Sequence, residues 1–153
     1  MNAAFFLTPR QQVSCLYDDF SLRQGLEKMR HHGYTAVPVV TRENKYVGTV
    51  SEGDFLWHIL EEGECGCIEL KDTEKMPLRE IIDPGKNPPV KITAKLPELI
   101  LRAENQNFIP VVDDLGSFIG IITRKSILKY FDGALPQEDL LKKYTRSSQK
   151  SAG

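Results

Sequence analysis

Apolar residues along the chain form short runs separated by polar turns. Residues 34–40 are almost continuously apolar, which is typical of a strand buried on both faces. A polar turn at 42–45 and an apolar run at 46–50 come next, and this order predicts a hairpin with Asn44 at a positive φ. An amphipathic segment begins after Ser51. The whole stretch is therefore predicted to form strand, hairpin, strand and helix.

The same pattern occurs a second time further along the chain. Pro38 and Pro110 are 72 residues apart, and so are Gly48 and Gly120, so the two stretches align without a gap. A pattern that occurs twice indicates a paired module rather than a solenoid. Periodicity and capping signals predict further strands at 13–17, 90–92, 108–112 and 118–123, and helices at 22–32, 78–82, 96–105, 123–131 and 136–144.

The repeats indicate how the chain is organised. Residues 1–12 are expected to form an irregular arm, with Phe5 and Phe6 either packed down or used in a dimer contact. The expected domains are a first repeat at 13–62, an acidic connection and linker at 63–84, a second repeat at 85–132, and a C-terminal helix with a disordered tail at 133–153.

Composition narrows the class of protein. The chain has 153 residues, enough for a substantial core, and its formal net charge of −1 argues against a nucleic-acid-binding or membrane-binding surface. The start lacks a signal-peptide pattern, and no apolar run approaches the ~18 residues of a membrane span. Three cysteines without a spaced framework fit a reducing compartment. We therefore expect a cytoplasmic protein with no nucleic-acid or membrane partner.

A seven-residue motif ends the second strand of each repeat and begins the following helix. Residues 48–54 contain Gly48, Ser51 and Asp54, and residues 120–126 repeat the pattern except that Ser126 stands where the first copy has the acid. Ser51 and Asp54 have the spacing of a helix capping box, which by itself would explain both residues.

These motifs and the Pro-Val-Val strands make residues 13–131 resemble a tandem pair of cystathionine-β-synthase (CBS) domains, or Bateman module. The resemblance implies an α/β fold in which each repeat is a small β-sheet with two helices and the sheets pack face to face. It implies a stand-alone bacterial regulatory protein that binds AMP, ADP, ATP or cyclic di-AMP between the repeats, with no cofactor besides this regulatory nucleotide. It also implies a homodimer and an unidentified protein partner.

The resemblance assigns ligand-binding roles to particular residues. Asp54, beside Ser51, would accept hydrogen bonds from the ribose hydroxyls. Because Ser126 replaces the acid, we expect one competent cleft and a second that is weak, empty or different. The base pocket would be formed by residues at the start of the long strands and before the first helix, namely Leu16, Tyr17, Tyr34, Thr35, Ala36, Pro38, Asn107, Phe108 and Pro110.

Thr123, Arg124 and Lys125 open the last helix of the second repeat. Two cations at a helix N-terminus oppose the macrodipole, by ~0.3–1 kcal/mol each when exposed. A phosphate bound to the free N–H groups would reverse this effect, with Arg124 offering a planar fork and Lys125 a point charge. The alternative is that both side chains bend into solvent.

No catalytic constellation emerges from the sequence. There is no phosphate loop with both glycines and a lysine, and Cys65 and Cys67 supply at most two metal ligands without a second pair. We therefore predict a regulatory module that is not an enzyme and has no metal site. A dimerisation scaffold with empty clefts is the main alternative, and an enzyme subunit is a second one.

Overall fold

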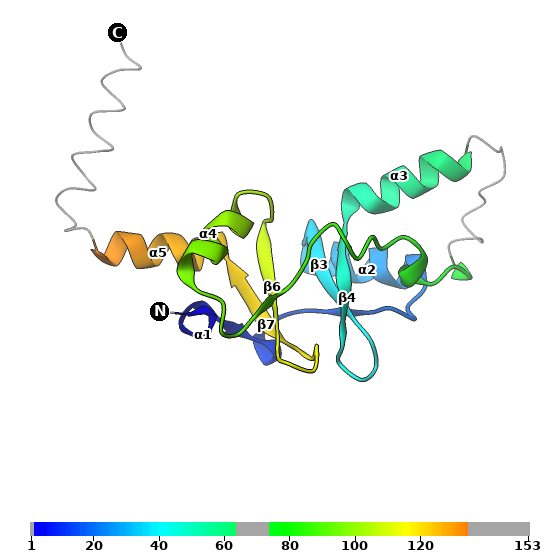
Figure 1. Cartoon of the computed structure of the whole chain (residues 1–153). Helices are drawn as coiled ribbons and strands as arrows, with labels where there is room; N and C mark the ends of the chain where they lie inside the picture. Colours follow the sequence, from blue (N-terminus) through cyan, green and yellow to red (C-terminus); the bar gives the residue numbers. More distant parts are fainter. Residues whose placement is uncertain (1, 64–73, 135–153) are drawn as a thin grey trace, which may run out of the picture.

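The computed structural model describes residues 2–63 and 74–134 and contains two small β-sheets with helices around them (Figure 1). The first sheet has the order β2-β3-β4. Its strand β2 (Leu16–Tyr17) is parallel to β3 (Ala36–Val40), which is antiparallel to β4 (Tyr46–Ser51). Helices α2 (Leu22–His32) and α3 (Glu52–Gly63) belong to the same repeat.

The second sheet has the order β1-β7-β6-β5. Strands β6 (Phe108–Val112) and β7 (Phe118–Thr123) form its antiparallel hairpin, and β5 (Val90–Lys91) lies parallel to β6. Helices α4 (Leu96–Ala103) and α5 (Arg124–Ala134) complete the second repeat. The predicted fold class, a mixed α/β fold with a small sheet and two helices per repeat, is confirmed.

Local capping signals fix the ends of α2. The side-chain oxygen of Ser21 accepts a hydrogen bond from the N–H of Gln24 at 3.2 Å, and the Gln24 side chain accepts one from the N–H of Ser21 at 3.0 Å. The helix ends at Gly33, whose φ of 70° lies in the left-handed region that glycine tolerates best. Both ends fall where the sequence predicted them.

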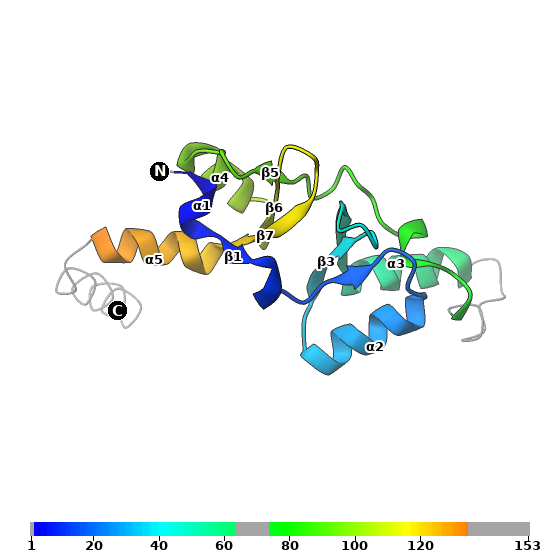
Figure 2. The same ribbon diagram turned by 90° about the horizontal axis from the view of Figure 1, so that it is seen from below.

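The N-terminal arm is more regular than the sequence suggested. It forms a short helix, α1 (Ala3–Phe6), and an edge strand, β1 (Thr8–Pro9), which pairs antiparallel with β7 (Figure 2). The main-chain N–H of Ala3 also donates to the carbonyl of Ala94 at 2.8 Å. The expectation of an irregular arm is therefore wrong. The regular structure of the arm is stabilised by contacts with the second repeat, and no periodic pattern within residues 1–12 predicts it.

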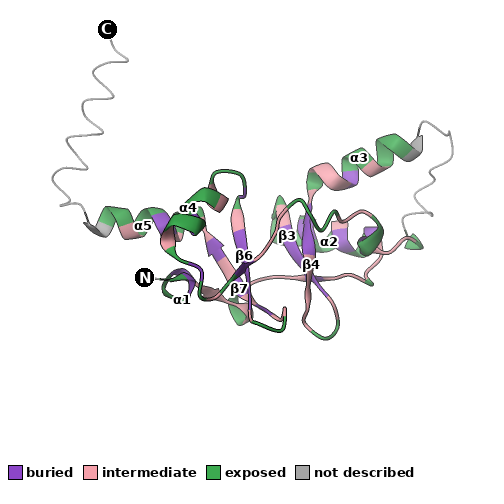
Figure 3. Ribbon diagram, viewed as in Figure 1, coloured by how far each residue is buried: buried purple, intermediate pink, exposed green. Residues whose placement is uncertain are grey.

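Each repeat has its own apolar core, and each core is completed by a segment that precedes the other repeat. Leu78, in the 3-10 helix η3 (Leu78–Glu80), is fully buried in the core of the first repeat. Phe6 of the arm is 5% exposed and packs in the core of the second repeat. Figure 3 shows that buried positions follow the strands, whereas most of the surface of α3 is exposed or half-buried.

The two motif glycines lie where these segments cross the sheets. A Cβ atom at Gly120 would overlap the carbonyl oxygen of Thr8, and a Cβ atom at Gly48 would overlap the Cγ2 atom of Ile82. Glycine at both positions therefore allows a second segment to approach the strand closely.

The tips of the two hairpins are hydrogen-bonded to each other. The N–H of Phe118 donates to the carbonyl of Asn44 at 2.8 Å, and the N–H of Tyr46 donates to the carbonyl of Gly116 at 3.3 Å. Asn44 and Gly116 are 72 residues apart, as are Tyr46 and Phe118, so an approximate two-fold axis passes between the tips. Asn44 has a φ of 64°, as predicted, and its tight turn places the donor and acceptor for this clamp.

Several parts of the predicted organisation lie outside the described residues. These are most of the acidic connection (64–73), the helix expected at 136–144 and the remaining tail. The helix expected to end at Phe131 continues in the structure to Ala134.

Candidate functional site

A cavity of about 220 Å³ lies between the two repeats, where the N-terminal arm and strands β3, β6 and β7 converge. Because both sheets and the arm contribute to it, the shape of the cavity depends on how the repeats sit against each other. The residues that line it are Thr8, Gln12, Val13, Ser14, Tyr34, Ala36, Val37, Pro38, Asn107, Phe108, Ile121 and Thr123.

The lining of this cavity is uncharged. Apolar groups such as Val13, Pro38 and Phe108 provide flat contact surface, and polar groups such as Asn107 and Ser14 provide hydrogen-bond donors and acceptors. Sites for drug-sized ligands usually measure about 300–1,000 Å³, so this cavity suits a smaller group. A neutral heteroaromatic ring with polar edges fits this combination of size and chemistry.

Six of the candidate residues that sequence reasoning selected line this cavity together. They come from the starts of β3 and β6 and the end of β7, and they are Tyr34, Ala36, Pro38, Asn107, Phe108 and Thr123. The remaining candidates do not line it; they are Leu16, Tyr17, Thr35, Ser51, Asp54, Pro110, Arg124 and Lys125.

Several of the residues outside the cavity have clear structural partners. Leu16 is buried in the first core, and Pro110 is fully buried. Tyr17 packs against Phe20 and lies under the guanidinium of Arg42, 4.0 Å from its ring centroid. These three candidates hold the strands in place rather than face the cavity.

The cavity-lining residues that sequence reasoning missed lie mainly in the arm and directly after it. They are Thr8, Gln12, Val13 and Ser14, together with Val37 and Ile121 on the strands. The arm was interpreted as irregular, and the roles considered for it were core packing or a dimer contact of Phe5 and Phe6. The signal that would have revealed it is Gly120, because an unexplained strand glycine often marks close approach of another backbone.

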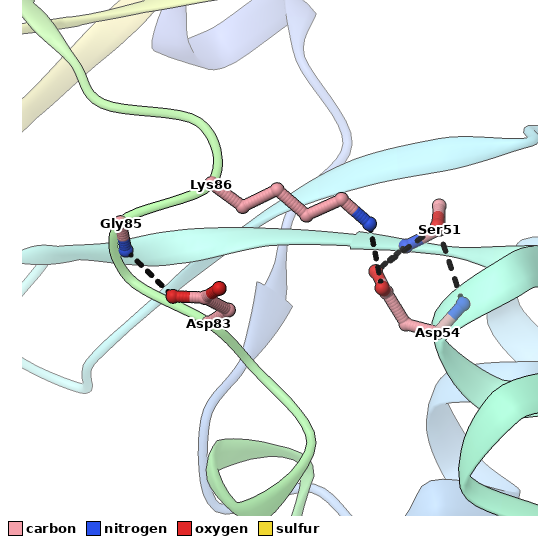
Figure 4. A network of polar contacts seen from close by, with 5 residues as sticks. All are labelled: Ser51, Asp54, Asp83, Gly85 and Lys86. Atoms are coloured by element: carbon pink, nitrogen blue, oxygen red, sulfur yellow. Dashed lines mark hydrogen bonds and ion pairs between the residues drawn. The ribbon is translucent and has the colours of Figure 1, made fainter.

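Asp54 lies at the start of α3 and makes the predicted capping box (Figure 4). Its Oδ2 atom accepts hydrogen bonds from the N–H and the hydroxyl of Ser51, at 2.8 and 3.0 Å. Its other oxygen, Oδ1, accepts from the ammonium of Lys86 at 3.0 Å. The Asp54 side chain is only 16% exposed, whereas that of Lys86 is 55% exposed. The carboxylate is therefore held in place and paired at both oxygens.

The segment that carries Lys86 is fixed on both sides. Asp83 accepts hydrogen bonds from Gly85 and from the main-chain N–H of Lys86, at 2.9 and 3.2 Å. On the other side, the Tyr46 hydroxyl donates to the carbonyl of Asn87 at 2.8 Å. Burial raises the pKa of Tyr46 to about 12, which keeps this hydroxyl protonated as a donor.

The Asp54 cluster is related to the cavity by the internal repeat. Ser51 and Lys86 are the counterparts, 72 residues earlier or later, of Thr123 and Ser14. Thr123 and Ser14 both line the cavity, whereas Ser51 and Lys86 both contact Asp54. The same place in the repeat is thus an open cavity on one side of the two-fold axis and an ion pair on the other.

The second motif has different chemistry. The Thr123 hydroxyl accepts from the N–H of Ser126 at 3.1 Å and caps α5. Arg124 turns toward the end of α4, where its Nε donates to the carbonyl of Ala103 at 2.8 Å and its Nη1 to the side chain of Asn107 at 3.3 Å. Lys125 is exposed. Arg124 therefore places its charge against the carbonyl end of a helix, where a cation is favourable, and sequence reasoning did not consider this partner.

Among residues 2–63 and 74–134, His, Cys, Asp and Glu side chains do not gather in groups of three. In those same ranges no helix has both the length and the apolar character that a bilayer crossing requires. Cys65 and Cys67 lie outside the described residues.

Comparison with known proteins gives the family. The sequence model of the CBS domain matches two segments, residues 7–61 and 75–133. The crystal structure of CbpB in complex with c-di-AMP is 28% identical, with a TM-score of 0.76, and the match covers 96% of this chain and 91% of that one. The crystal structure of CBSX2 in complex with AMP is 25% identical, with a TM-score of 0.70, covering 87% of this chain and 97% of that one.

A match to a larger protein is partial. Homoserine O-acetyltransferase from Methanococcus vannielii is 28% identical over 119 residues, which are 76% of this chain but only 22% of the enzyme's length. This chain therefore spans about a fifth of that relative. The two tandem family matches and the common fold establish that the chain belongs to the CBS-domain family and carries two copies of the domain.

Proposed function

We propose that this chain is a regulatory module without catalytic activity that binds an adenine nucleotide between its repeats and signals to a protein partner. The observation that carries the proposal is the uncharged cavity between the repeats, lined by polar edges and flat apolar groups. The similar structures of CbpB and CBSX2 contain c-di-AMP and AMP, respectively, and this supports an adenine nucleotide as the ligand class.

In this proposal the adenine ring occupies the cavity. Pro38 and Phe108 cover its faces, and Asn107 reads its edge. The cavity's volume of about 220 Å³ leaves the sugar and phosphate outside it. At the counterpart position across the two-fold axis, Asp54 accepts the ribose hydroxyls of a second nucleoside.

We propose that ligand binding is signalled by a change in how the two repeats pack against each other. A ligand that touches β3, β6, β7 and the arm at once stabilises one arrangement of the two sheets over others. Apolar side chains exposed on α3, including Leu56, Trp57 and Leu60, support a homodimer or a protein partner on that helix.

One observation favours the alternative of a scaffold with an empty cleft. Lys86 already pairs with Asp54, so both carboxylate oxygens accept hydrogen bonds from the protein itself. In that alternative the ion pair is a permanent structural contact, and ligand binding is absent.

A thermal shift panel with AMP, ADP, ATP and cyclic di-AMP separates the two functions. A ligand present at 100 times its Kd adds about 2.7 kcal/mol to the free energy of unfolding, which raises Tm by roughly 5–10 °C for a domain of this size. We expect such a shift with at least one of these nucleotides. Unchanged Tm values with the whole panel would favour the scaffold.

A matched pair of variants tests whether the ligand binds in the cavity. Ala36→Leu adds volume to a cavity-lining residue and is expected to remove the Tm shift. Ala4→Leu adds the same volume at an exposed position of α1 and should leave the shift unchanged. If both variants kept the full shift, the ligand would bind elsewhere.

A further inference from the structure

Lys86 contacts the atom of Asp54 that a ribose would need. Asp54 Oδ2 already accepts two hydrogen bonds from Ser51, which also cap α3. Only Oδ1 is available to a ligand, and the Lys86 ammonium lies 3.0 Å from it. A ribose hydroxyl that donates to Oδ1 therefore competes with the Lys86 ammonium for this oxygen.

The structure gives Lys86 the freedom to move away from Oδ1. Its side chain is 55% exposed, and its flexible four-carbon stem carries the charge as a point rather than as a fixed fork. Its backbone is held by the Asp83 turn and by the Tyr46–Asn87 hydrogen bond, so a rotation of the side chain would leave the backbone of Lys86 at the site. Lys86 thus remains within reach of any group that a ligand brings to Asp54.

The charge balance at the site determines which ligands compensate for the loss of the Lys86–Asp54 ion pair. A neutral nucleoside exchanges the Lys86 ion pair for hydrogen bonds to hydroxyl groups and leaves the ammonium without a partner. A ligand that also carries a phosphate gives the ammonium a new anionic partner while its ribose takes the carboxylate. The exchange is then favourable at both ends.

We propose that Lys86 is the specificity residue of this site: its ammonium transfers from Asp54 to the phosphate of the bound ligand, and the site selects phosphorylated adenosine ligands over adenosine. This inference rests on the proposed function and names the residue that sets its ligand class. It also gives the ion pair a role before a ligand binds, because Lys86 neutralises a carboxylate that is only 16% exposed.

Calorimetric titrations with adenosine, AMP and cyclic di-AMP test the proposal on the full chain. In Lys86→Met we expect the Kd of the phosphorylated ligands to rise about tenfold, because a charge-assisted hydrogen bond is lost. The Kd of adenosine should fall about two- to threefold, because the competing ion pair is gone. Opposite changes for the two ligand types are the signature of the transfer.

Two further variants complete the test. Lys91→Met removes another exposed ion-paired lysine, whose partner Asp114 is itself exposed, and should change no Kd. Asp54→Asn should weaken all three ligands at the site that contains this carboxylate, and the loss identifies which binding event uses it.

The outcomes separate the inference from the proposed function. If the wild-type chain binds none of the three ligands, the proposed function fails and the inference fails with it. If the chain binds nucleotides but Lys86→Met changes adenosine and AMP affinity equally, or neither, the Lys86 transfer is wrong while nucleotide binding stands. Binding that responds to Ala36→Leu but not to Asp54→Asn or Lys86→Met also overturns it.

Discussion

Gly120 and Gly48 occupy the same place in the two repeats, yet each meets a different neighbour. At Gly120 the neighbour is the main chain of Thr8, which belongs to a paired strand and has little freedom to move. At Gly48 the neighbour is the end of the Ile82 side chain, which has some freedom to rotate. The cost of adding a methyl group should therefore differ between the two positions.

Gly120→Ala is expected to lower the free energy of unfolding by about 1–3 kcal/mol, since the arm must shift away from β7. Gly48→Ala should cost less than Gly120→Ala. Gly53→Ala is the control: its nearest neighbour, the Ser51 hydroxyl, is 3.6 Å from the new Cβ atom, and alanine favours a helix by about 1 kcal/mol over glycine. Urea denaturation measures all three, and equal losses for Gly120→Ala and Gly53→Ala would contradict the crossing geometry.

Tyr46 makes the free energy of unfolding decrease at alkaline pH. Its pKa is raised from 10.0 to about 12 by burial, so the folded state favours the protonated hydroxyl. The resulting stabilisation is complete below pH 10 and is lost as pH rises from about 10 to 12, by about 2–3 kcal/mol in total.

Tyr46→Phe isolates this effect. The variant lacks the hydrogen bond to Asn87, so its free energy of unfolding at pH 7 should be lower by about 1 kcal/mol. Above pH 10, its free energy of unfolding should fall less steeply than that of the wild type. Chemical denaturation across pH 7–11 gives both values. An unchanged slope above pH 10 would show that another group controls the alkaline transition.

At the scale of elements, the strands of the two hairpins were the most predictable features. Residues 108–112 and 118–123 were expected as strands and form β6 and β7 with those bounds. Their apolar runs are bounded by turn residues, so local pattern alone defines them. The arm was not predictable in this way, because α1 and β1 are short and depend on partners more than 80 residues away in sequence.

Phe6 and Phe5 test whether the arm is an integral part of the second repeat. Phe6 is 5% exposed within the second core, and Phe6→Ala should cost about 3–5 kcal/mol of unfolding free energy. Phe5 is 64% exposed, so Phe5→Ala should cost far less. If Phe6→Ala unfolds no more easily than Phe5→Ala in urea, the arm does not complete that core.

Arg124 links the start of α5 to the end of α4, and this contact competes with the phosphate role that its position in the motif predicts. Arg124→Ala is expected to lower the unfolding free energy by about 1 kcal/mol, because the Ala103 carbonyl loses a charged donor. Affinities for adenosine and AMP should then change alike. A loss confined to AMP in calorimetry would instead assign Arg124 to the phosphate.

At the scale of the whole molecule, the internal repeat determines both the arrangement of the fold and the position of the candidate site. Hairpin tips are clamped around the approximate two-fold axis, and the segments preceding each repeat complete the opposite core. The cavity and the Asp54 cluster then occupy equivalent positions on either side of that axis.

Sequence reasoning selected cavity-lining residues that lie on or beside the strands and missed those whose position depends on how other segments fold across the sheets. Ala36 and Asn107 were found because each opens a strand of the repeat, and both line the cavity. Ser14 and Lys86 were missed because their roles arise only when the arm and the linker fold across the sheets. The two sides differ in the structure, since the side with Asp54 holds an ion pair and the other side holds the open cavity, whereas the expectation that the Asp54 cleft is the competent one stays a prediction.

Backbone amide shifts in a two-dimensional NMR titration test the central claim most directly. With AMP or cyclic di-AMP, saturable shifts should concentrate at residues 12–14 at the end of the arm, at the start of β3 around Ala36, and at Asn107 and Phe108. The hairpin tips at 41–45 should change much less, since they lie away from the cavity lining. Shifts confined to the outer helices, or none at millimolar ligand, would contradict nucleotide binding between the repeats.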